Sequence, residues 1–180
     1  AWHYAALKQM EGIAGALDKQ DDVAFYASES DAFKKRFIRS FFDVRKGYFT
    51  DGLAADTDHA SLHGNMFPLA FDLVPAGKKQ NVIYFIQTRG MACSVYGSQF
   101  LMDALYEAND AEYALHMLTK TDDRSWYNMI RVGSTISLEA WDNKYKPNQD
   151  WNHAWGAAPA NIIPRRLMGV EPLTPGFGTA

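Results

Sequence analysis

Apolar residues recur at helical spacing along most of the chain. Near the start, four of them fall at positions i, i+3, i+4 and i+7, namely Met10, Ile13, Ala14 and Leu17. Such spacing predicts one face of an amphipathic helix. The polar stretch DKQDD follows, and Tyr26, Phe33 and Phe37 then indicate a second helix. Together these segments predict a helical hairpin.

The same pattern continues to the end of the chain. Further helices are predicted at residues 59–73, 79–88, 96–108, 111–120, 126–132 and 152–168. Pro75 and Gly77 end the first of these, and Asn109 with Asp110 makes the turn of the clearest hairpin. The alternation typical of strands is almost absent, so we expect an all-α fold.

Paired helices in series are typical of an α-solenoid or of a toroid of α-hairpins. A solenoid would repeat with a fixed period, whereas the loops here differ in length and the helices do not align. The pattern favours the toroid, and we assign residues 1–168 to part of it. Residues 169–180, rich in Gly and Pro, are interpreted as an exit linker toward a further domain. We expect both ends to be cut and the chain to be a fragment.

Composition excludes several partners. The 180 residues, 47% of them hydrophobic, suffice for one globular unit, and the net charge of -3 gives no electrostatic footprint for nucleic acid. No apolar run approaches the ~20 residues that span a bilayer, so we expect no membrane partner. The single cysteine, Cys93, excludes an internal disulfide and leaves the compartment open, because a bacterial cytoplasmic enzyme and a periplasmic or secreted one both fit. No cofactor is predicted.

The candidate chemistry lies in STISLEAWDNKYKPNQDWNHAWGAA, residues 134–157. Glu139 follows small and hydroxylated residues and precedes Trp141. Because apolar rings disfavour a charged carboxylate, we expect a raised pKa and a general base; the alternative is a surface glutamate at a helix end. Asn152 and His153 begin the last predicted helix, where the imidazole could donate to a substrate hydroxyl or to Glu139, or be structural.

Four of the five tryptophans lie in the last third of the chain, namely Trp126, Trp141, Trp151 and Trp155. The apolar C–H faces of sugars stack on aromatic rings, and their hydroxyls need polar side chains, so this cluster favours a carbohydrate site. Core packing is the alternative. We expect it for at least one of Trp151 and Trp155, whose spacing would place both on one side of a helix.

Two other patterns suggest chemistry more weakly. HASLH would place His59 and His63 one helical turn apart, with Asp56 and Asp58 upstream, as in some zinc sites. The glutamate of a metalloprotease motif is absent and no third ligand can be named, so no metal site is predicted. Cys93 has no assignable base and is interpreted as a small buried residue.

Several segments together resemble a known family. GMACSVYGSQFLMDALYEANDAEYALHMLTK, DDRSWYNMIRVGSTISLEAWD and NHAWGAAPANIIPRRLMGVEPLTPGF look like the C-terminal half of the catalytic domain of bacterial α-L-rhamnosidases. DGLAADTDHASLHGNMFPLAFDLVP resembles the middle helices of that domain. The most specific element is the ordered set Trp126, Gly133, Glu139, Trp141, Asp142 and Asn152-His153.

The resemblance implies an (α/α)6 toroid that carries an inverting glycoside hydrolase, which releases terminal α-L-rhamnose from glycosides or polysaccharides. Glu139 matches the general base that activates water. The expected substrate-binding positions are His153, Trp141, Trp126, Asn152 and, on a middle helix that faces the same pocket, His59. The family's general acid lies in the N-terminal half of the toroid, so the partners implied are the carbohydrate substrate and that missing half. The isolated chain is expected to be inactive.

Two positions depart from the family pattern. Leu138 and Ala140 stand where the family commonly has an aromatic residue before the base and an arginine after it. Substrate preference is therefore open. One alternative is another six-hairpin enzyme that acts on a different sugar, since a fold does not fix its substrate. The other is a non-catalytic α-helical module that binds carbohydrate.

Overall fold

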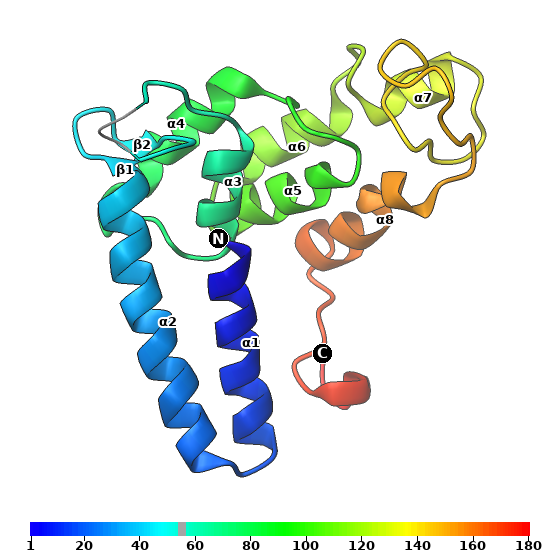
Figure 1. The fold of residues 1–180 in the computed structure, drawn as a ribbon. Helices are drawn as coiled ribbons and strands as arrows, with labels where there is room; N and C mark the ends of the chain where they lie inside the picture. Colours follow the sequence, from blue (N-terminus) through cyan, green and yellow to red (C-terminus); the bar gives the residue numbers. More distant parts are fainter. Residues whose placement is uncertain (54–56) are drawn as a thin grey trace. The chain divides into compact units, whose positions relative to one another are not determined.

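The computed structural model describes residues 1–53 and 57–180. Its described residues are mostly helical, which confirms the all-α prediction (Figure 1). The chain divides into two compact units, Ala1–Arg89 and Gly90–Ala180, where composition suggested a single one. Within the described residues, no helix has the length and apolar character needed to cross a membrane.

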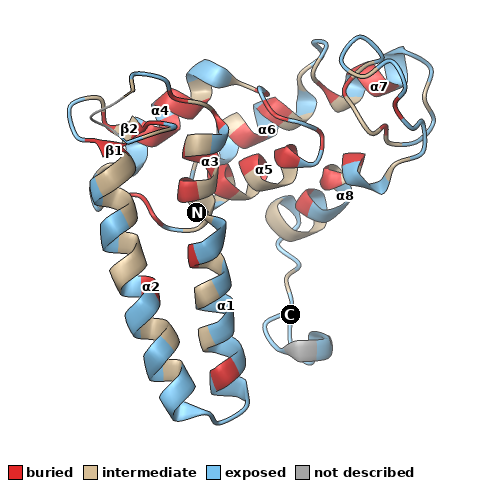
Figure 2. Ribbon diagram, viewed as in Figure 1, coloured by how far each residue is buried: buried red, intermediate tan, exposed pale blue. Residues whose placement is uncertain are grey.

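The first unit begins with the predicted hairpin, α1 (Trp2–Ala16) and α2 (Gln20–Phe41), whose helices run antiparallel (Figure 1). Of the four apolar positions predicted to face a core, only Ala14 is buried. Ile13 and Leu17 are 52% and 61% exposed, and Figure 2 shows how little of α1 and α2 is buried. The helices were therefore predicted correctly, but their packing was not, because two helices alone bury only a narrow seam.

The rest of the first unit is built around a short hairpin. Strands β1 (Phe42–Asp43) and β2 (Tyr48–Phe49) pair antiparallel and are followed by α3 (His63–Ala70) and α4 (Lys79–Arg89). The buried amide of Asn65 on α3 donates to the carbonyl of Phe49 at 3.0 Å and accepts its N–H at 2.9 Å. This pairing fixes the hairpin on α3. The prediction for α4 is confirmed, whereas α3 begins later than predicted.

The second unit begins with α5 (Gly97–Glu107) and α6 (Ala111–Thr119), the clearest of the predicted hairpins. Asn109 makes its turn with a φ of 63°, a left-handed conformation that asparagine tolerates better than most residues. Leu101, Leu105 and Met117 are buried in its core. The short helix α7 (Trp126–Arg131) follows, with the Ser125 hydroxyl accepting the Asn128 N–H at its start.

The predicted helix over residues 152–168 is wrong as a single element. The chain forms a 3₁₀ turn at Ala154–Gly156, helix α8 (Ala158–Ile162) and a π-helical turn at Ile163–Leu167. Pro164 has no N–H to donate within a regular helix, which explains why the α-helix ends before it. A further 3₁₀ turn lies at Pro175–Phe177, and the assignment of residues 169–180 as a linker stays a prediction.

Candidate functional site

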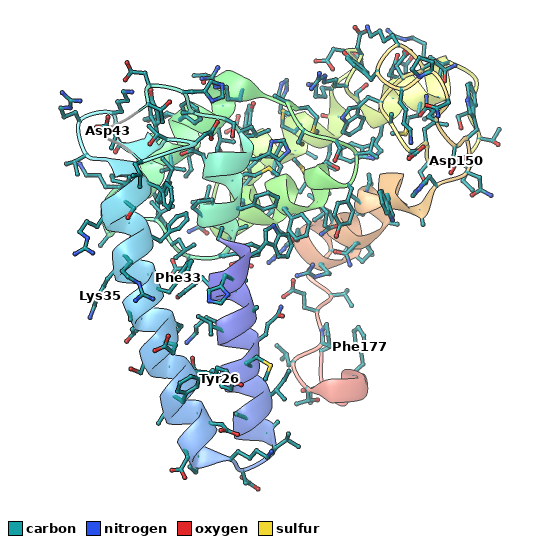
Figure 3. The ribbon with its side chains drawn as sticks, viewed as in Figure 1. Tyr26, Phe33, Lys35, Asp43, Asp150 and Phe177 are labelled. Carbon is teal, nitrogen blue, oxygen red and sulfur yellow. The ribbon has the colours of Figure 1, made fainter. Side chains whose placement is uncertain are left out.

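Residues 133–157 connect α7 to the last turns of the second unit with almost no regular structure, and we call them the Glu139 loop. Hydrogen bonds join its two sides. The Glu139 N–H donates to the carbonyl of Asp150 at 3.1 Å, and the His153 N–H donates to the carbonyl of Ser137 at 2.9 Å. The Ser137 hydroxyl donates to the carbonyl of His153 at 2.7 Å. These bonds bring Glu139 and His153 onto neighbouring segments. Asp150, whose carbonyl accepts the first of them, is labelled in Figure 3.

The carboxylate of Glu139 is held by two donors. The Lys146 ammonium bonds one oxygen, and the backbone N–H of Asp150 donates to the other at 3.0 Å. The Lys146 bond lowers the pKa of Glu139, and the Asp150 N–H and the nearby His153 act in the same direction. The expected rise in pKa is therefore wrong, because a cation and a backbone donor contact this carboxylate in place of apolar rings.

Trp141 supports the loop from the core. Its side chain is only 3% exposed, and its indole N–H donates to the carbonyl of Cys93 at 2.7 Å. The ring meets that of Trp126 edge-on at 5.1 Å, and the Trp126 N–H donates to the carbonyl of Gly156 at 2.8 Å. Trp141 is thus placed to hold the loop in position, while the half-buried Trp126 retains an accessible face.

Core packing was expected for Trp151 or Trp155, and that prediction is wrong. Both side chains are exposed, at 43% and 57%. The predicted helix that would have placed them on one side does not form, since Trp151 precedes the 3₁₀ turn that contains Trp155. Trp141 is the buried tryptophan of this loop.

Gly156 permits a close approach between the two sides of the loop. A Cβ atom at this position would clash with the carbonyl oxygen of Leu138 and would lie 2.9 Å from the Cβ of Ser137. Any side chain would therefore push residues 153–156 away from the segment that carries Glu139.

The buried side-chain amides of Gln149 and Asn128 hold the rest of the Glu139 loop in place. The sequence did not predict this role for them. Gln149 accepts the Ala140 N–H at 2.9 Å, and Asn128 donates to the carbonyl of Trp141 and to the carboxylate of Asp142, both at 3.0 Å. The Asn128 bond lowers the pKa of Asp142. Nothing in their spacing distinguishes these residues from surface polar ones. Lys146 was missed for the same reason.

His153 precedes the 3₁₀ turn and accepts the backbone N–H of Trp155 through Nδ1 at 3.3 Å. In the neutral imidazole this assigns the proton to Nε2, which is then a donor for a ligand. The His153 ring lies edge-on to Trp155 at 4.7 Å, and the adjacent Asn152 is exposed. The structure therefore places His153 and Asn152 in the same loop as Glu139.

His59 belongs to the first unit, in the segment before α3. Its Nδ1 lies 2.5 Å from the carboxylate of Asp51, which also accepts the Ser61 N–H at 3.1 Å and the Ser61 hydroxyl at 2.8 Å. Partial burial raises the pKa of Asp51, but the bonds from Ser61 and His59 outweigh it, so the net shift is downward. These bonds hold the segment out of a helix, which corrects the prediction that His59 lies on the third helix one turn before His63.

The structure also bears on the weaker candidates. Among the described residues, no group of three or more His, Cys, Asp and Glu side chains is arranged to hold a metal ion. Asp56, which the sequence placed near the histidines, lies outside the described residues. Cys93 is buried, as expected, and burial raises the pKa of its thiol to about 12. A thiol of that pKa is protonated near neutral pH and is a poor nucleophile.

An open hollow of about 480 Å³ borders the Glu139 loop. Its lining includes Trp126, Ile136, Ser137, Gly156 and Pro159. Trp126 is therefore part of this lining, whereas Glu139 and His153 are not, and the substrate-binding role of Trp126 stays a prediction.

A family model described as the bacterial α-L-rhamnosidase 6 hairpin glycosidase domain matches residues 1–167. Among curated proteins, none matches the chain. The structure is similar to that of α-L-rhamnosidase from Dictyoglumus thermophilum, with a TM-score of 0.77 and 20% identity over 90% of this chain and 18% of that one.

A second similar structure is Streptomyces avermitilis α-L-rhamnosidase complexed with L-rhamnose. Its TM-score is 0.75, with 19% identity over 97% of this chain and 17% of that one. These likenesses confirm that the chain has the all-α fold of part of a six-hairpin toroid. The chain spans less than a fifth of the length of either rhamnosidase, at 18% and 17%.

Proposed function

Because the chain belongs to the bacterial α-L-rhamnosidase six-hairpin glycosidase family, we propose that it forms part of an inverting glycoside hydrolase. The enzyme releases terminal α-L-rhamnose from glycosides or polysaccharides, and Glu139 is its general base. The observation that carries this proposal is the state of Glu139, an ionised carboxylate fixed by Lys146 and the Asp150 N–H in the same loop as His153.

Glu139 has the form and the acceptor capacity that a base needs. Its lowered pKa keeps the carboxylate ionised near neutral pH. Each carboxylate oxygen offers two lone pairs, and each accepts one hydrogen bond from the protein, so one lone pair per oxygen remains for water. In an inverting reaction that water loses its proton to the base while it attacks the anomeric carbon. The Nε2 donor of His153 is available to hold a sugar hydroxyl nearby.

The second carboxyl group comes from outside residues 1–180. Inversion requires an acid that protonates the leaving oxygen, at ~6.5–9.5 Å from the base. The resemblance assigns this acid to the other half of the toroid. We therefore expect that residues 1–180 alone do not turn over an α-L-rhamnoside and that the intact protein does.

The proposal names rhamnose as the sugar that is released, and the alternative is that the enzyme acts on another sugar. Leu138 is fully buried and Ala140 carries only a methyl group, so neither position offers an aromatic or cationic side chain to a substrate. A six-hairpin enzyme without those two groups has fewer side-chain contacts with which to select its sugar.

Product stereochemistry tests the proposal. The intact protein is mixed with aryl α-L-rhamnoside, and the released sugar is followed by proton NMR from the first minute. We expect β-L-rhamnose to appear first and then to mutarotate. Initial release of α-L-rhamnose would overturn the inverting mechanism. Release from a different aryl glycoside only would assign the enzyme to that sugar, and release from none would favour a non-catalytic binding module.

A further inference from the structure

A second hollow, of about 490 Å³, is lined by residues of the second unit, Trp155 among them. Its lining includes Tyr96, Gln99, Trp155, Asn161 and Arg165, and we call it the Tyr96 hollow. These residues come from the start of α5, the 3₁₀ turn, α8 and the π-helical turn. None of them belongs to the catalytic residues proposed above.

Two aromatic rings form one wall of the Tyr96 hollow. Tyr96 is 50% exposed and Trp155 is 57% exposed, and their rings lie 5.3 Å apart at an angle of 43°. In the part of the chain that the structure describes, neither the Tyr96 hydroxyl nor the Trp155 indole N–H has a hydrogen-bond partner. Each ring thus offers an apolar face and a free polar tip, the combination suited to a sugar ring.

The polar side of the hollow is electrically balanced. The Gln99 amide donates to Asn161 at 3.1 Å and to Asp103 at 2.8 Å. Arg165 donates to Asn161 at 2.9 Å and pairs with Glu171 at 3.1 Å. Since carboxylates already neutralise the guanidinium, the hollow lacks the uncompensated positive charge that would select an anion.

The hollow connects with the Glu139 loop through one residue. Trp155 contacts the ring of His153 edge-on at 4.7 Å, and the His153 N–H donates to the carbonyl of Ser137, two residues before Glu139, at 2.9 Å. A saccharide held against Trp155 would therefore lie next to the loop that carries the base.

We propose that the Tyr96 hollow is a binding subsite for a neutral sugar residue of the substrate chain, stacked on Tyr96 and Trp155 and hydrogen-bonded by Gln99 and Asn161. The choice of a rhamnose-containing ligand rests on the function proposed above. The binding site itself is inferred from the aromatic pair and from the polar side chains without net charge beside it. The subsite would favour saccharides of two or more residues over a single sugar.

Binding measurements on the intact protein test this subsite. An α-linked rhamnose disaccharide is titrated by calorimetry into the Glu139→Gln protein and into the same protein with Tyr96→Ala, Tyr96→Phe or Tyr127→Ala. We expect Tyr96→Ala to weaken binding about tenfold, since an aromatic stacking contact is worth roughly one such factor. Tyr96→Phe keeps the ring and should lose less. Tyr127 is also 50% exposed but does not line the hollow, so Tyr127→Ala should leave the affinity unchanged.

The outcomes separate the subsite from the reaction. Equal affinities in the Tyr96→Ala and Tyr127→Ala proteins, or no binding of the disaccharide, would overturn the subsite even if the wild-type protein releases rhamnose. A selective loss in Tyr96→Ala would support the subsite even if the wild-type protein hydrolyses no rhamnoside, in which case only the hydrolase proposal fails. Trp155→Ala is the weaker test, because Trp155 also contacts His153.

Discussion

Each unit places a carboxylate near a histidine, Asp51 with His59 in the first and Glu139 with His153 in the second. Asp51 bonds its histidine through Oδ2, and both acceptor sites of its Oδ1 are taken by the N–H and the hydroxyl of Ser61. Glu139 is instead bound by Lys146 and the Asp150 N–H, one donor to each oxygen, and within the described residues no hydrogen bond joins it to His153. The pKa of both carboxyl groups is lowered, so the shift alone does not separate the two. Their hydrogen-bond partners do: Asp51 bonds the segment before α3 with three of its four acceptor sites, whereas Glu139 keeps two of its four sites for the water that the proposed base would activate.

The largest expected effect is on turnover. In the intact protein, Glu139→Gln should lower kcat for an aryl α-L-rhamnoside by about 10²–10⁴-fold, because the amide cannot take the proton from water. Sugar binding should be largely retained, since the shape of the side chain is kept. Glu112→Gln, an exposed change on α6, is the control and should leave kcat unchanged. Normal turnover by the Glu139→Gln protein would show that Glu139 is not the base and that it does not differ from Asp51 in this respect.

A second prediction concerns the support of the Glu139 loop. Trp141→Ala should lower the free energy of unfolding by about 3–5 kcal/mol, because it removes a buried ring and leaves the Cys93 carbonyl without its donor. Trp151→Ala removes an exposed ring of the same loop and should cost less than about 0.5 kcal/mol. Chemical denaturation monitored by circular dichroism checks both. Similar losses in the two variants would contradict the core role of Trp141.

The third prediction tests the structural role of Asp51. Asp51→Ala removes the acceptor of the Ser61 N–H and should destabilise the protein by about 1–3 kcal/mol. Asp58→Ala, which breaks only an exposed pair with Lys46, is the matched control and should cost less than about 0.5 kcal/mol. Thermal unfolding of the two variants measures the difference. An Asp51→Ala protein as stable as the control would show that these bonds do not hold the segment before α3.

The sequence predicted regular helices better than it predicted the site. Apolar spacing located α1, α2 and α4 to α7, because periodicity is a local property. The last α-helix ends before Pro164 because proline has no N–H to donate, and α3 starts as late as His63 because hydrogen bonds to Asp51 hold the segment before it. The spacing of apolar residues predicts neither effect.

The site was predicted in part. The sequence placed His153 at the start of a long helix, whereas it precedes a short 3₁₀ turn in the same loop as Glu139, and the expected direction of the Glu139 pKa shift was wrong. A turn causes the difference, in which the Tyr145 N–H donates to the carbonyl of Asp142 at 3.0 Å and brings Lys146 back toward Glu139. A lysine seven residues after a glutamate gives no such signal in the sequence, and the burial of Gln149 and Asn128 is equally invisible there.

The most direct test of the account is the pH dependence of kcat/KM in a matched pair of lysine variants. A base works only when ionised, so kcat/KM falls as the pH drops through the pKa of Glu139, which Lys146 holds down. Lys146→Met should therefore move the acid limb of the profile to higher pH. Lys144→Met removes a neighbouring lysine that pairs with Asp123, and it should leave the limb in place. An acid limb that stays where it is in the Lys146→Met protein, or that moves equally in both variants, would contradict the assignment of Glu139 as the base.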